Sequence, residues 1–297
     1  MKVIRTIAGM RQEIKQYRIE HPAGVIGFVP TMGYLHGGHE SLIHRARQEA
    51  DLVVLSIFVN PLQFGPNEDF ERYPRDEERD LRIAAEAGAD LVFIPKVQEM
   101  YPREVLTTVQ VRKITERLCG ASRPGHFDGV CTVVSKLFHI VGPDRAYFGM
   151  KDAQQVAVIM QMVQDLNIPV EIVPCPTMRE ADGLALSSRN VYLNEEERRQ
   201  AVVLYQALEA ADEYIHTQQG GTCEELREMI RQKIQMAPLA DIDYIEIVTF
   251  PGLEPLPDRV KIAGTLQQQP VLAALAVRFG STRLIDNRLW TAKGGLV

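Results

Sequence analysis

The sequence predicts an α/β protein with a Rossmann-like parallel sheet in its N-terminal domain and a smaller α+β C-terminal domain. Over roughly the first 175 residues, short apolar runs alternate with amphipathic stretches, as in parallel sheets wrapped by helices. After residue 177 the pattern changes to charged helical stretches followed by strand-like runs. A chain of 297 residues is also longer than one small core usually organises. We therefore expect one domain over residues 1–177 and a second over residues 178–297.

The N-terminal elements follow from apolar spacing and from residues that stop helices. The run at residues 52–59 is continuous and β-branched, which is typical of a strand buried on both faces. Gly88 is a preferred helix stop after the amphipathic stretch that begins near residue 76. We expect strands at residues 25–29, 52–59, 90–94, 145–148 and 170–173, helices at residues 7–17, from about 39, 76–88, 129–141 and 152–166, and a long loop at residues 60–75.

The C-terminal part begins with a polar segment, residues 179–190, at the predicted domain junction. Helical stretches precede strand-like runs, so we expect antiparallel strands here. The predicted helices lie at residues 194–211 and 222–236, and the predicted strands at residues 242–248, 260–263, 271–278 and 282–289.

Composition argues against several classes of protein. The net charge of −6 does not attract nucleic acid, so an anionic substrate would need a local cluster of positive groups. No apolar run is long enough to cross a bilayer, and the N-terminus lacks the apolar stretch of a secretory signal. The four cysteines are scattered, which argues against a zinc site or a disulfide framework. We expect a cytoplasmic protein that binds neither membranes nor nucleic acid.

Residues 30–39, with the sequence PTMGYLHGGH, carry the most informative pattern of the chain. A buried strand runs into a small-residue turn that contains His36 and His39, and a helix follows. Backbone N–H groups at a helix start attract anions, and these two histidines share one face of the first turn. Three interpretations are open: a capped helix start with incidental histidines, a metal site that lacks further local ligands, and a polyphosphate site. We favour the phosphate site, because the glycines of the turn allow close backbone approach.

Two further turns place polar side chains just beyond predicted strands. Asn60 and Gln63 follow the second strand, at the edge where open α/β sheets bind ligands. Lys151 lies in a later turn where its ammonium group could meet a phosphate, and Gln155 follows one helical turn on. Each segment also has a purely structural interpretation: an ordinary polar loop, or a turn in which Asp152 caps the next helix and Lys151 faces solvent.

Two more segments carry charged or hydroxyl side chains. Residues 187–189 supply two hydroxyls and a guanidinium, which suit phosphate oxygens, although a Ser-rich linker is the alternative. Arg123 and His126 lie in a tight turn before a helix, as ligand contacts or as parts of a structured turn. The chain contains neither the P-loop nor the dinucleotide fingerprint, and no hydrolytic nucleophile stands out.

Together these segments resemble the pantothenate synthetase (pantoate–β-alanine ligase) family of the HxGH nucleotidyltransferase superfamily. The blocks that carry the resemblance lie at residues 30–39, 58–64, 123–130, 148–155 and 187–190 and read PTMGYLHGGH, FVNPLQF, RPGHFDGV, FGMKDAQQ and SSRN. They occur in order over nearly the whole chain, with no departure at a motif position. Five ordered blocks are far more specific than the H-x-G-H pattern alone.

The resemblance implies ATP-dependent condensation of (R)-pantoate with β-alanine to pantothenate, through a pantoyl-adenylate and with release of AMP and pyrophosphate. It also implies Mg²⁺, a cytoplasmic homodimer and a place in coenzyme A biosynthesis. Magnesium would be held mainly by phosphate oxygens, with one carboxylate from residues 76–80. The loop at residues 65–79 would act as a gate that excludes water from the mixed anhydride.

The same resemblance assigns roles to individual residues. His36, His39 and Lys151 would be catalytic, with His39 as the proton donor to the leaving group. Gln63 would bind pantoate and β-alanine, and Gln155 would bind pantoate. The implied ATP-binding residues are Met32, Gly33, Tyr34, Leu35, His36, Gly37, Gly38, His39, Gly149, Met150, Lys151, Asp152, Met178, Leu186, Ser187, Ser188 and Arg189.

Two rival functions stay open on the sequence. One is a nucleotidyltransferase of the same superfold that attaches a nucleotide and stops, against which Gln63, Gln155 and the C-terminal domain argue. The other is a nucleotide-sensing protein that binds ATP without chemistry.

Overall fold

The computed structural model describes residues 1–66, 68, 70–217 and 221–292, and the chain divides into two compact units. The first unit contains Met1–Gly149 and Val158–Cys175, and the second contains Met150–Ala157 and Pro176–Val297. The sequence placed the domain boundary between residues 177 and 178, whereas the units divide just before Pro176. The turn that contains Lys151 groups with the second unit.

The first unit is built on a six-stranded parallel sheet with the strand order β1-β4-β3-β2-β5-β6. This confirms the predicted Rossmann-like fold. The sequence missed β1, because this edge strand is too short to show a periodic pattern. The strands are β1 (Lys2–Ile4), β2 (Ile26–Thr31), β3 (Leu52–Ile57), β4 (Leu91–Phe93), β5 (Arg145–Gly149) and β6 (Glu171–Cys175).

The strand order reverses between β2 and β5. Strand β2 pairs with β3 on one side and with β5 on the other, so the chain continues from these two neighbours toward opposite edges of the sheet. In such sheets, ligands bind beyond the carboxyl ends of the strands at the reversal. Strand β2 runs directly into the His36 turn, and β5 runs directly into the 3₁₀ helix η2 (Met150–Asp152).

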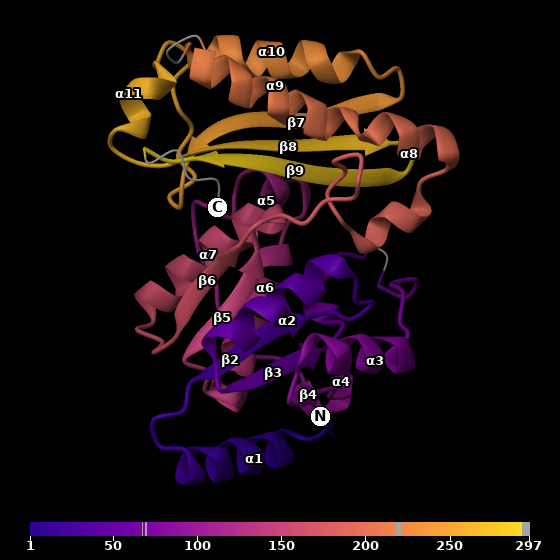
Figure 1. Cartoon of the computed structure of the whole chain (residues 1–297), viewed down its shortest axis with the longest axis vertical. Coiled ribbons are helices and arrows are strands. Elements are labelled where there is room, and N and C mark those ends of the chain that lie inside the picture. The colour runs from indigo at the N-terminus through magenta and orange to yellow at the C-terminus, as the bar shows by residue number, and fades with distance from the viewer. Residues whose placement is uncertain (67, 69, 218–220, 293–297) are drawn as a thin grey trace. The chain divides into compact units, whose positions relative to one another are not determined.

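Helices cover both faces of the parallel sheet (Figure 1). Adjacent residues of β2 point to opposite faces. Val29 shares a cluster with Leu42 and Ile43 of α2, whereas Phe28 meets the ring of Phe138 of α6 edge-on at 6.4 Å. The helices of the N-terminal part are α1 (Ile7–Glu20), α2 (Gly37–Glu49), α3 (Glu77–Ala87), α4 (Val97–Met100), α5 (Cys119–Ser122), α6 (His126–Val141) and α7 (Ala153–Asp165).

The second unit has an antiparallel sheet of β7 (Ala240–Thr249), β8 (Val271–Phe279) and β9 (Thr282–Trp290), with β8 in the centre. Figure 1 shows α9 (Val203–Thr217) and α10 (Cys223–Gln235) running along one face of this sheet. Leu208 of α9, Ile230 of α10 and Leu275 of β8 are fully buried in their shared core. Each long element therefore contributes an apolar stripe to one cluster.

Two predictions for this unit were wrong. The predicted strand at residues 260–263 is instead the start of helix α11 (Ile262–Leu266), because Ile262 and Leu266 are four residues apart and both pack on the core. The single helix predicted at residues 194–211 is two helices, α8 (Glu195–Ala201) and α9, which extends further than predicted. Val202 between them keeps helical dihedrals, φ −60° and ψ −19°. The break between the two helices is therefore a break in the hydrogen-bond pattern and not in the backbone conformation.

Among the described residues, no helix combines the length and the apolar character needed to cross a bilayer.

Helix α6 approaches the 3₁₀ helix η1 (Pro61–Gln63) through a glycine. A Cβ atom on Gly129 would lie 2.3 Å from the carbonyl oxygen of Leu62 and 2.6 Å from the backbone nitrogen of Gln63. The carbonyl of Gly129 in turn accepts a hydrogen bond from Asn60 Nδ2 at 3.0 Å. Close packing at this position therefore fixes the segment that carries Gln63.

We expect Gly129→Ala to lower the free energy of unfolding by about 1–3 kcal/mol, because backbone atoms of η1 would have to move. Urea unfolding measures this effect. Gly264→Ala in α11 is the matched control, since its Cβ would meet nothing within 4 Å, and should be neutral or stabilising by up to about 1 kcal/mol. Equal stability of Gly129→Ala and the native protein would contradict the close approach.

Candidate functional site

The His36 turn is a helix start that the two histidines cap reciprocally. His36 is the N-cap of α2, and its Nδ1 accepts a hydrogen bond from the backbone N–H of Gly38 at 3.1 Å. His39 occupies the third helical position, and its Nδ1 accepts from the backbone N–H of His36 at 3.3 Å. Together they form a capping box made of imidazoles. The helix starts at Gly37, slightly earlier than the sequence indicated.

These hydrogen bonds set the tautomer of both rings. A neutral imidazole that accepts at Nδ1 carries its proton on Nε2. The ring centroids of His36 and His39 are 4.1 Å apart and the planes are tilted by 38°. Helix capping therefore explains the hydrogen bonds at Nδ1 of both rings. Binding of phosphate would use the other nitrogen, Nε2, whose N–H can donate to an oxygen. A neutral donor of this kind suits a helix N-terminus, where a second positive charge would be unfavourable.

A buried carboxylate supports the turn from below. Gly33 and Tyr34 both have positive φ, 85° and 52°, which turns their neighbouring N–H groups to one side. Asp80 of α3 accepts from Tyr34 N–H and from Leu35 N–H, each at 2.7 Å, through its two different oxygens. A Cβ at Gly33 would lie 2.9 Å from Asp80 Oδ2, so glycine is needed for space as well as for its dihedral angle.

The environment of Asp80 is nearly closed to water. The residue is 1% exposed, and burial raises the pKa of its carboxyl group, while the N–H groups of Leu35 and Tyr34 and the charge of Arg79 oppose that shift. Arg79 also stacks on the ring of Tyr34, with 5.0 Å between guanidinium carbon and ring centroid. A buried carboxylate is tolerated only when it is hydrogen-bonded, so the turn and Asp80 stabilise each other.

Gln63 lies next to the His36 turn within a buried polar network. It is 7% exposed, and its Nε2 lies 3.0 Å from Met32 Sδ at the base of the turn. Asn60 Nδ2 donates to Gln63 Oε1 at 3.2 Å, and the Tyr101 hydroxyl donates to Asn60 Oδ1 at 2.8 Å. Burial raises the pKa of Tyr101, so its hydroxyl keeps its proton. The structure thus brings Gln63 to the turn that contains both histidines.

Arg123 and His126 hold the segment that follows Gln63. Arg123 makes two hydrogen bonds of 2.7 Å to the two carboxylate oxygens of Glu68. His126 Nδ1 donates to the carbonyl of Gln63 at 2.8 Å, and its Nε2 lies 3.0 Å from Arg123 Nη1. These contacts are those expected if Arg123 and His126 are parts of a structured turn. Glu68 belongs to the predicted gate at residues 65–79, of which residues 67 and 69 lie outside the described residues.

Of the other predicted site residues, Gly149 belongs to the first unit and the rest belong to the second. Gly149 ends β5, whereas Met150, Lys151 and Asp152 form η2 and Gln155 follows in the first turn of α7. Lys151 is half-buried and Asp152 is exposed.

A short hairpin precedes residues 187–189. Leu186 N–H donates to the carbonyl of Met178 at 2.9 Å, and Arg179 bridges to Ala185 in antiparallel fashion. Ser187 then caps the 3₁₀ helix η3 (Ser188–Tyr192) by accepting from the N–H of Arg189 at 3.2 Å. Ser188 and Arg189 therefore lie at the start of a short helix rather than in a linker.

Within each unit the structure brings predicted residues together. In the first unit, residues 32–39 and Gln63 form one group around Met32 and Asp80. In the second unit, η2 and the hairpin at residues 178–186 both contact β9. Lys151, Gln155 and residues 186–189 all lie in this second unit.

Sequence reasoning missed Asp80, although a signal exists. Asp80, Ala84 and Ala87 are the buried positions of α3, at spacings of four and three residues. Asp80 thus occupies the apolar stripe of its helix, and a carboxylate at such a position needs buried partners. Asp286 of β9 gives a similar signal, since it follows buried Thr282 and Leu284 at alternating positions.

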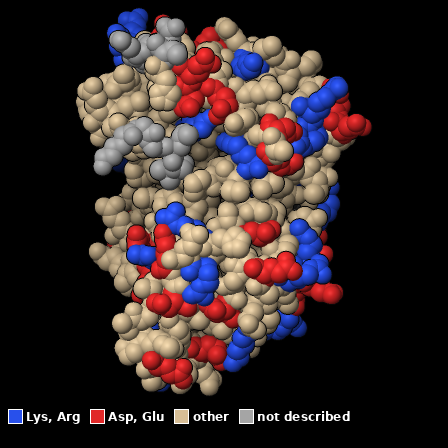
Figure 2. All heavy atoms as spheres, in the orientation of Figure 1, with Lys and Arg blue, Asp and Glu red and all other residues tan. Residues whose placement is uncertain are grey.

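No group of three or more His, Cys, Asp or Glu side chains suited to a metal ion occurs among the described residues. All four cysteines are buried and none forms a disulfide. Burial raises the pKa of Cys131 to about 12 and that of Cys175 to about 11, so these thiols stay protonated near neutral pH. Figure 2 shows acidic and basic side chains interspersed on the face that it draws, in keeping with local rather than global capture of an anion.

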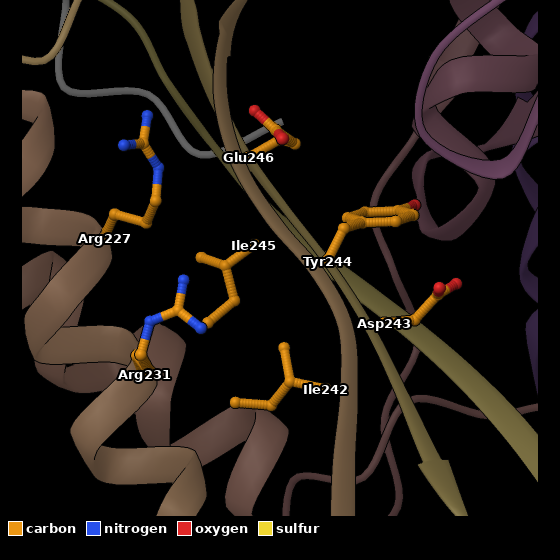
Figure 3. Close-up of a pocket in the computed structure, with 7 residues that line it drawn as sticks. All are labelled: Arg227, Arg231, Ile242, Asp243, Tyr244, Ile245 and Glu246. Atoms are coloured by element: carbon orange, nitrogen blue, oxygen red, sulfur yellow. The ribbon is translucent and has the colours of Figure 1, made fainter. Parts of the chain in front are cut away.

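A surface pocket of about 420 Å³ lies elsewhere, between α10 and β7 of the second unit. Figure 3 shows Arg227 and Arg231 on one side and Asp243 and Glu246 along the strand on the other. Arg227 is also paired with Asp258 at 2.6 Å. The pocket contains none of the predicted site residues, and its opposed charges favour no one type of ligand.

Comparison with known proteins gives consistent matches over the full length. A family model described as pantoate–β-alanine ligase matches residues 2–289. The pantothenate synthetase of Geobacillus kaustophilus (strain HTA426) is 57% identical over 287 residues, which cover 97% of this chain and 92% of that protein.

Solved structures agree with this match. Pantothenate synthetase from Thermus thermophilus has a TM-score of 0.87 and 50% identity, covering 97% of this chain and 98% of that chain. Pantoate–β-alanine ligase from Francisella tularensis, complexed with β-γ ATP and β-alanine, has a TM-score of 0.76 and 36% identity over 99% of both chains.

We expect Asp80→Asn to disturb the His36 turn, because an amide offers one acceptor oxygen where two N–H groups need one each. The free energy of unfolding should fall by about 1–3 kcal/mol, the cost of one unsatisfied buried group. Chemical unfolding tests this, with Asp76→Asn as control, since Asp76 caps the same helix at an exposed site. A native-like Asp80→Asn would contradict the supporting role.

The ion pair of Glu68 with Arg123 predicts a pH dependence of stability. Burial alone would raise the pKa of Glu68, but hydrogen bonds and charge from Arg123 outweigh it and hold that pKa below its usual range. The stabilisation is therefore present above the unfolded pKa and is lost as pH falls through the lowered folded pKa. We expect Glu68→Gln to cost about 0.5–1 kcal/mol at pH near 7. That cost should shrink below pH of about 4, as urea unfolding at several pH values would show; a constant difference would contradict the pairing.

Proposed function

This chain belongs to the pantoate–β-alanine ligase family and forms pantothenate from pantoate and β-alanine, and we propose that it does so with ATP through a pantoyl-adenylate. The observation that carries the proposal is the His36 turn at the end of β2, where two imidazole rings, with centroids 4.1 Å apart, lie at the N-terminus of α2. A relative complexed with β-γ ATP and β-alanine supports ATP as the nucleotide.

In the first step, a carboxylate oxygen of pantoate attacks the α-phosphorus of ATP. The bond from this phosphorus to the bridging oxygen breaks, and pyrophosphate leaves with both electrons. His36 and His39 would donate hydrogen bonds from Nε2 to the triphosphate. For His39, which the resemblance gives as proton donor to the leaving group, the capping bond at Nδ1 favours a hydrogen bond to the leaving oxygen rather than release of the proton. Lys151 would hold the phosphates as a point charge. Because no covalent enzyme intermediate is needed, catalysis would consist of positioning and charge stabilisation.

The nucleotide would be held largely by backbone groups. We propose residues 32–39 and Gly149 with η2 for this role, together with Met178 and Leu186. Ser187, Ser188 and Arg189 would add hydroxyls and a guanidinium to the phosphate oxygens. The positive φ angles of Gly33 and Tyr34 and the helix start at Gly37 support this assignment, since such turns expose N–H groups to anions.

In the second step, the amine of β-alanine attacks the carbonyl carbon of the pantoyl-adenylate. The carbon–oxygen bond to AMP breaks, a proton leaves the nitrogen, and pantothenate and AMP are released. Gln63 would hold pantoate and β-alanine, and Gln155 would hold pantoate. The burial of Gln63 and its bonding to Asn60 support this role, because a fixed amide can orient both a hydroxyl and a carboxylate. The loop at residues 65–79 would exclude water.

Magnesium fits this site if it is bound mainly by the phosphates of ATP rather than by protein side chains alone. Mg²⁺ is commonly bound by substrate phosphates with one or two carboxylates, and it would neutralise phosphate charge. Within residues 76–80, both oxygens of Asp80 accept backbone N–H groups and Glu77 pairs with Arg5. Asp76 or Glu78 would therefore supply the carboxylate.

We also propose a cytoplasmic homodimer that acts in coenzyme A biosynthesis. Family membership supports this proposal. Gel filtration with light scattering would test the dimer, since a monomer at working concentration would contradict it.

We expect Lys151→Ala and His39→Ala to lose pantoate-dependent ATP–pyrophosphate exchange by about 10²–10³-fold while remaining folded, the usual effect of removing one stabilising donor. His39→Gln is the matched variant, because glutamine at the third helical position retains the capping acceptor but lacks the imidazole. It should be as inactive as His39→Ala and more stable.

The same assays separate the rival functions. Mass spectrometry should detect pantoyl-adenylate when β-alanine is omitted. Exchange that is independent of pantoate would favour a simple nucleotidyltransferase, and ATP binding without AMP formation would favour a nucleotide sensor. Near-normal turnover of either alanine variant would contradict the assigned roles.

A further inference from the structure

Strand β9 carries two adjacent buried polar residues inside the second unit. Asp286 is 3% exposed and Asn287 is 8% exposed. Neighbouring residues of a strand point to opposite faces, so the two side chains serve different surroundings. Burying two polar side chains in a strand is costly unless each finds partners. Asn287 finds them in the turn that contains Lys151, and Asp286 finds them in the hairpin before residues 187–189.

Asn287 holds the turn that contains Lys151. Its Nδ2 donates to the carbonyl oxygen of Met150 at 2.7 Å and to that of Lys151 at 2.9 Å. An amide NH₂ group has two hydrogens, so one side chain satisfies two consecutive carbonyls. Fixing two successive peptide groups leaves the backbone of Lys151 little freedom, and the remaining freedom of its ammonium group is that of the side chain alone.

Asp286 anchors the same strand to the hairpin before residues 187–189. Its Oδ1 accepts from Asn287 N–H at 2.8 Å and from Arg179 Nη2 at 3.0 Å, and its Oδ2 accepts from Arg179 Nη1 at 2.7 Å. Arg179 Nη1 also donates to the carbonyl of Gly183 at 3.1 Å, and its guanidinium stacks on Tyr205 at 4.8 Å. The point from which Asn287 acts is therefore rigid.

We propose that Asn287 is a positioning residue of the ligase, which places Lys151 for adenylate formation by fixing the carbonyls of Met150 and Lys151. The proposal rests on the function proposed above, in which Lys151 holds the phosphates. Sites held by a rigid element through supporting hydrogen bonds keep the geometry that catalysis needs. Asn287 touches no reacting atom and acts through η2, the turn that contains Lys151.

The physical consequence is a loss of rate without a loss of fold. A displacement of a catalytic group by about 1 Å can cost about 10²-fold in rate. Asn287→Asp has nearly the same shape but presents carboxylate oxygens to two carbonyl oxygens, so η2 would move away. Protonation of that carboxyl group would restore one donor, whereas Asn287→Ala has none to restore.

The test measures pantoate-dependent ATP–pyrophosphate exchange for the whole enzyme and for Asn287→Asp and Asn287→Ala. Both variants should lose exchange by about 10²-fold at pH near 8, mainly in kcat. Relative to the native enzyme, Asn287→Asp should recover as pH is lowered toward about 5, while Asn287→Ala should not. Aminolysis of supplied pantoyl-adenylate by β-alanine should fall by less than exchange in both, because no phosphate charge has to be stabilised for pyrophosphate to leave. If the carboxylate introduced by Asn287→Asp prevents folding, the exchange rate of Asn287→Ala tests the proposal instead.

A control separates positioning from general stability. Thr249 is a buried residue at the end of β7, in the same sheet. Thr249→Val removes a part-buried hydrogen bond, from the N–H of Glu254 to Thr249 Oγ1 at 3.1 Å, and should lower stability without lowering exchange. In the double variant with Lys151→Ala, Asn287→Asp should cause much less further loss than it does alone, because its main effect runs through a side chain already removed.

The possible failures are distinguishable. If Lys151→Ala keeps exchange, the proposed function of Lys151 fails and this inference fails with it. If Lys151→Ala loses exchange but Asn287→Asp and Asn287→Ala keep it, this inference alone is overturned. It is also overturned if aminolysis falls as much as exchange, or if the losses multiply in the double variant.

Discussion

The contact between the Asp80 carboxylate and two successive backbone N–H groups is the constraint on which the His36 turn depends. The turn takes left-handed dihedrals at Gly33 and Tyr34, which leave the N–H groups of Tyr34 and Leu35 buried without a partner in a helix or strand. One charged side chain from α3 satisfies both. The cost of burying that charge and the cost of bending the chain are thus met by the same hydrogen bonds.

The position of the turn then decides the chemistry of the histidines. Because the chain leaves the turn with His36 extended, this residue becomes the N-cap of α2 and His39 comes to the third helical position. Their Nδ1 atoms close the capping box, and the tautomer follows. The tautomer of the neutral rings and the helix start are therefore consequences of a backbone conformation, and that conformation depends on a residue more than forty positions away.

The two units use the same design with different elements. In the first, a buried carboxylate on a helix fixes a turn through N–H groups, and in the second, a buried amide on a strand fixes a turn through carbonyls.

Much of the fold was predictable, because periodic apolar spacing marks the long helices and strands. Strand β1 and helix α11 were not, since three or five residues show no decisive period. The motif residues could be recognised locally, whereas Asp80 and Asn287 act through partners that only folding brings near, and the grouping of Lys151 with the second unit has no local signal.

The state of the cysteines has a practical consequence. All four are buried, and the thiols of Cys131 and Cys175 are held protonated well above neutral pH. Alkylating dyes react with accessible thiolate, which these side chains do not offer. A single cysteine introduced on the surface would accordingly be the preferred attachment point for a fluorophore or a spin label. The native cysteines therefore need not be replaced before a label is attached at an introduced cysteine.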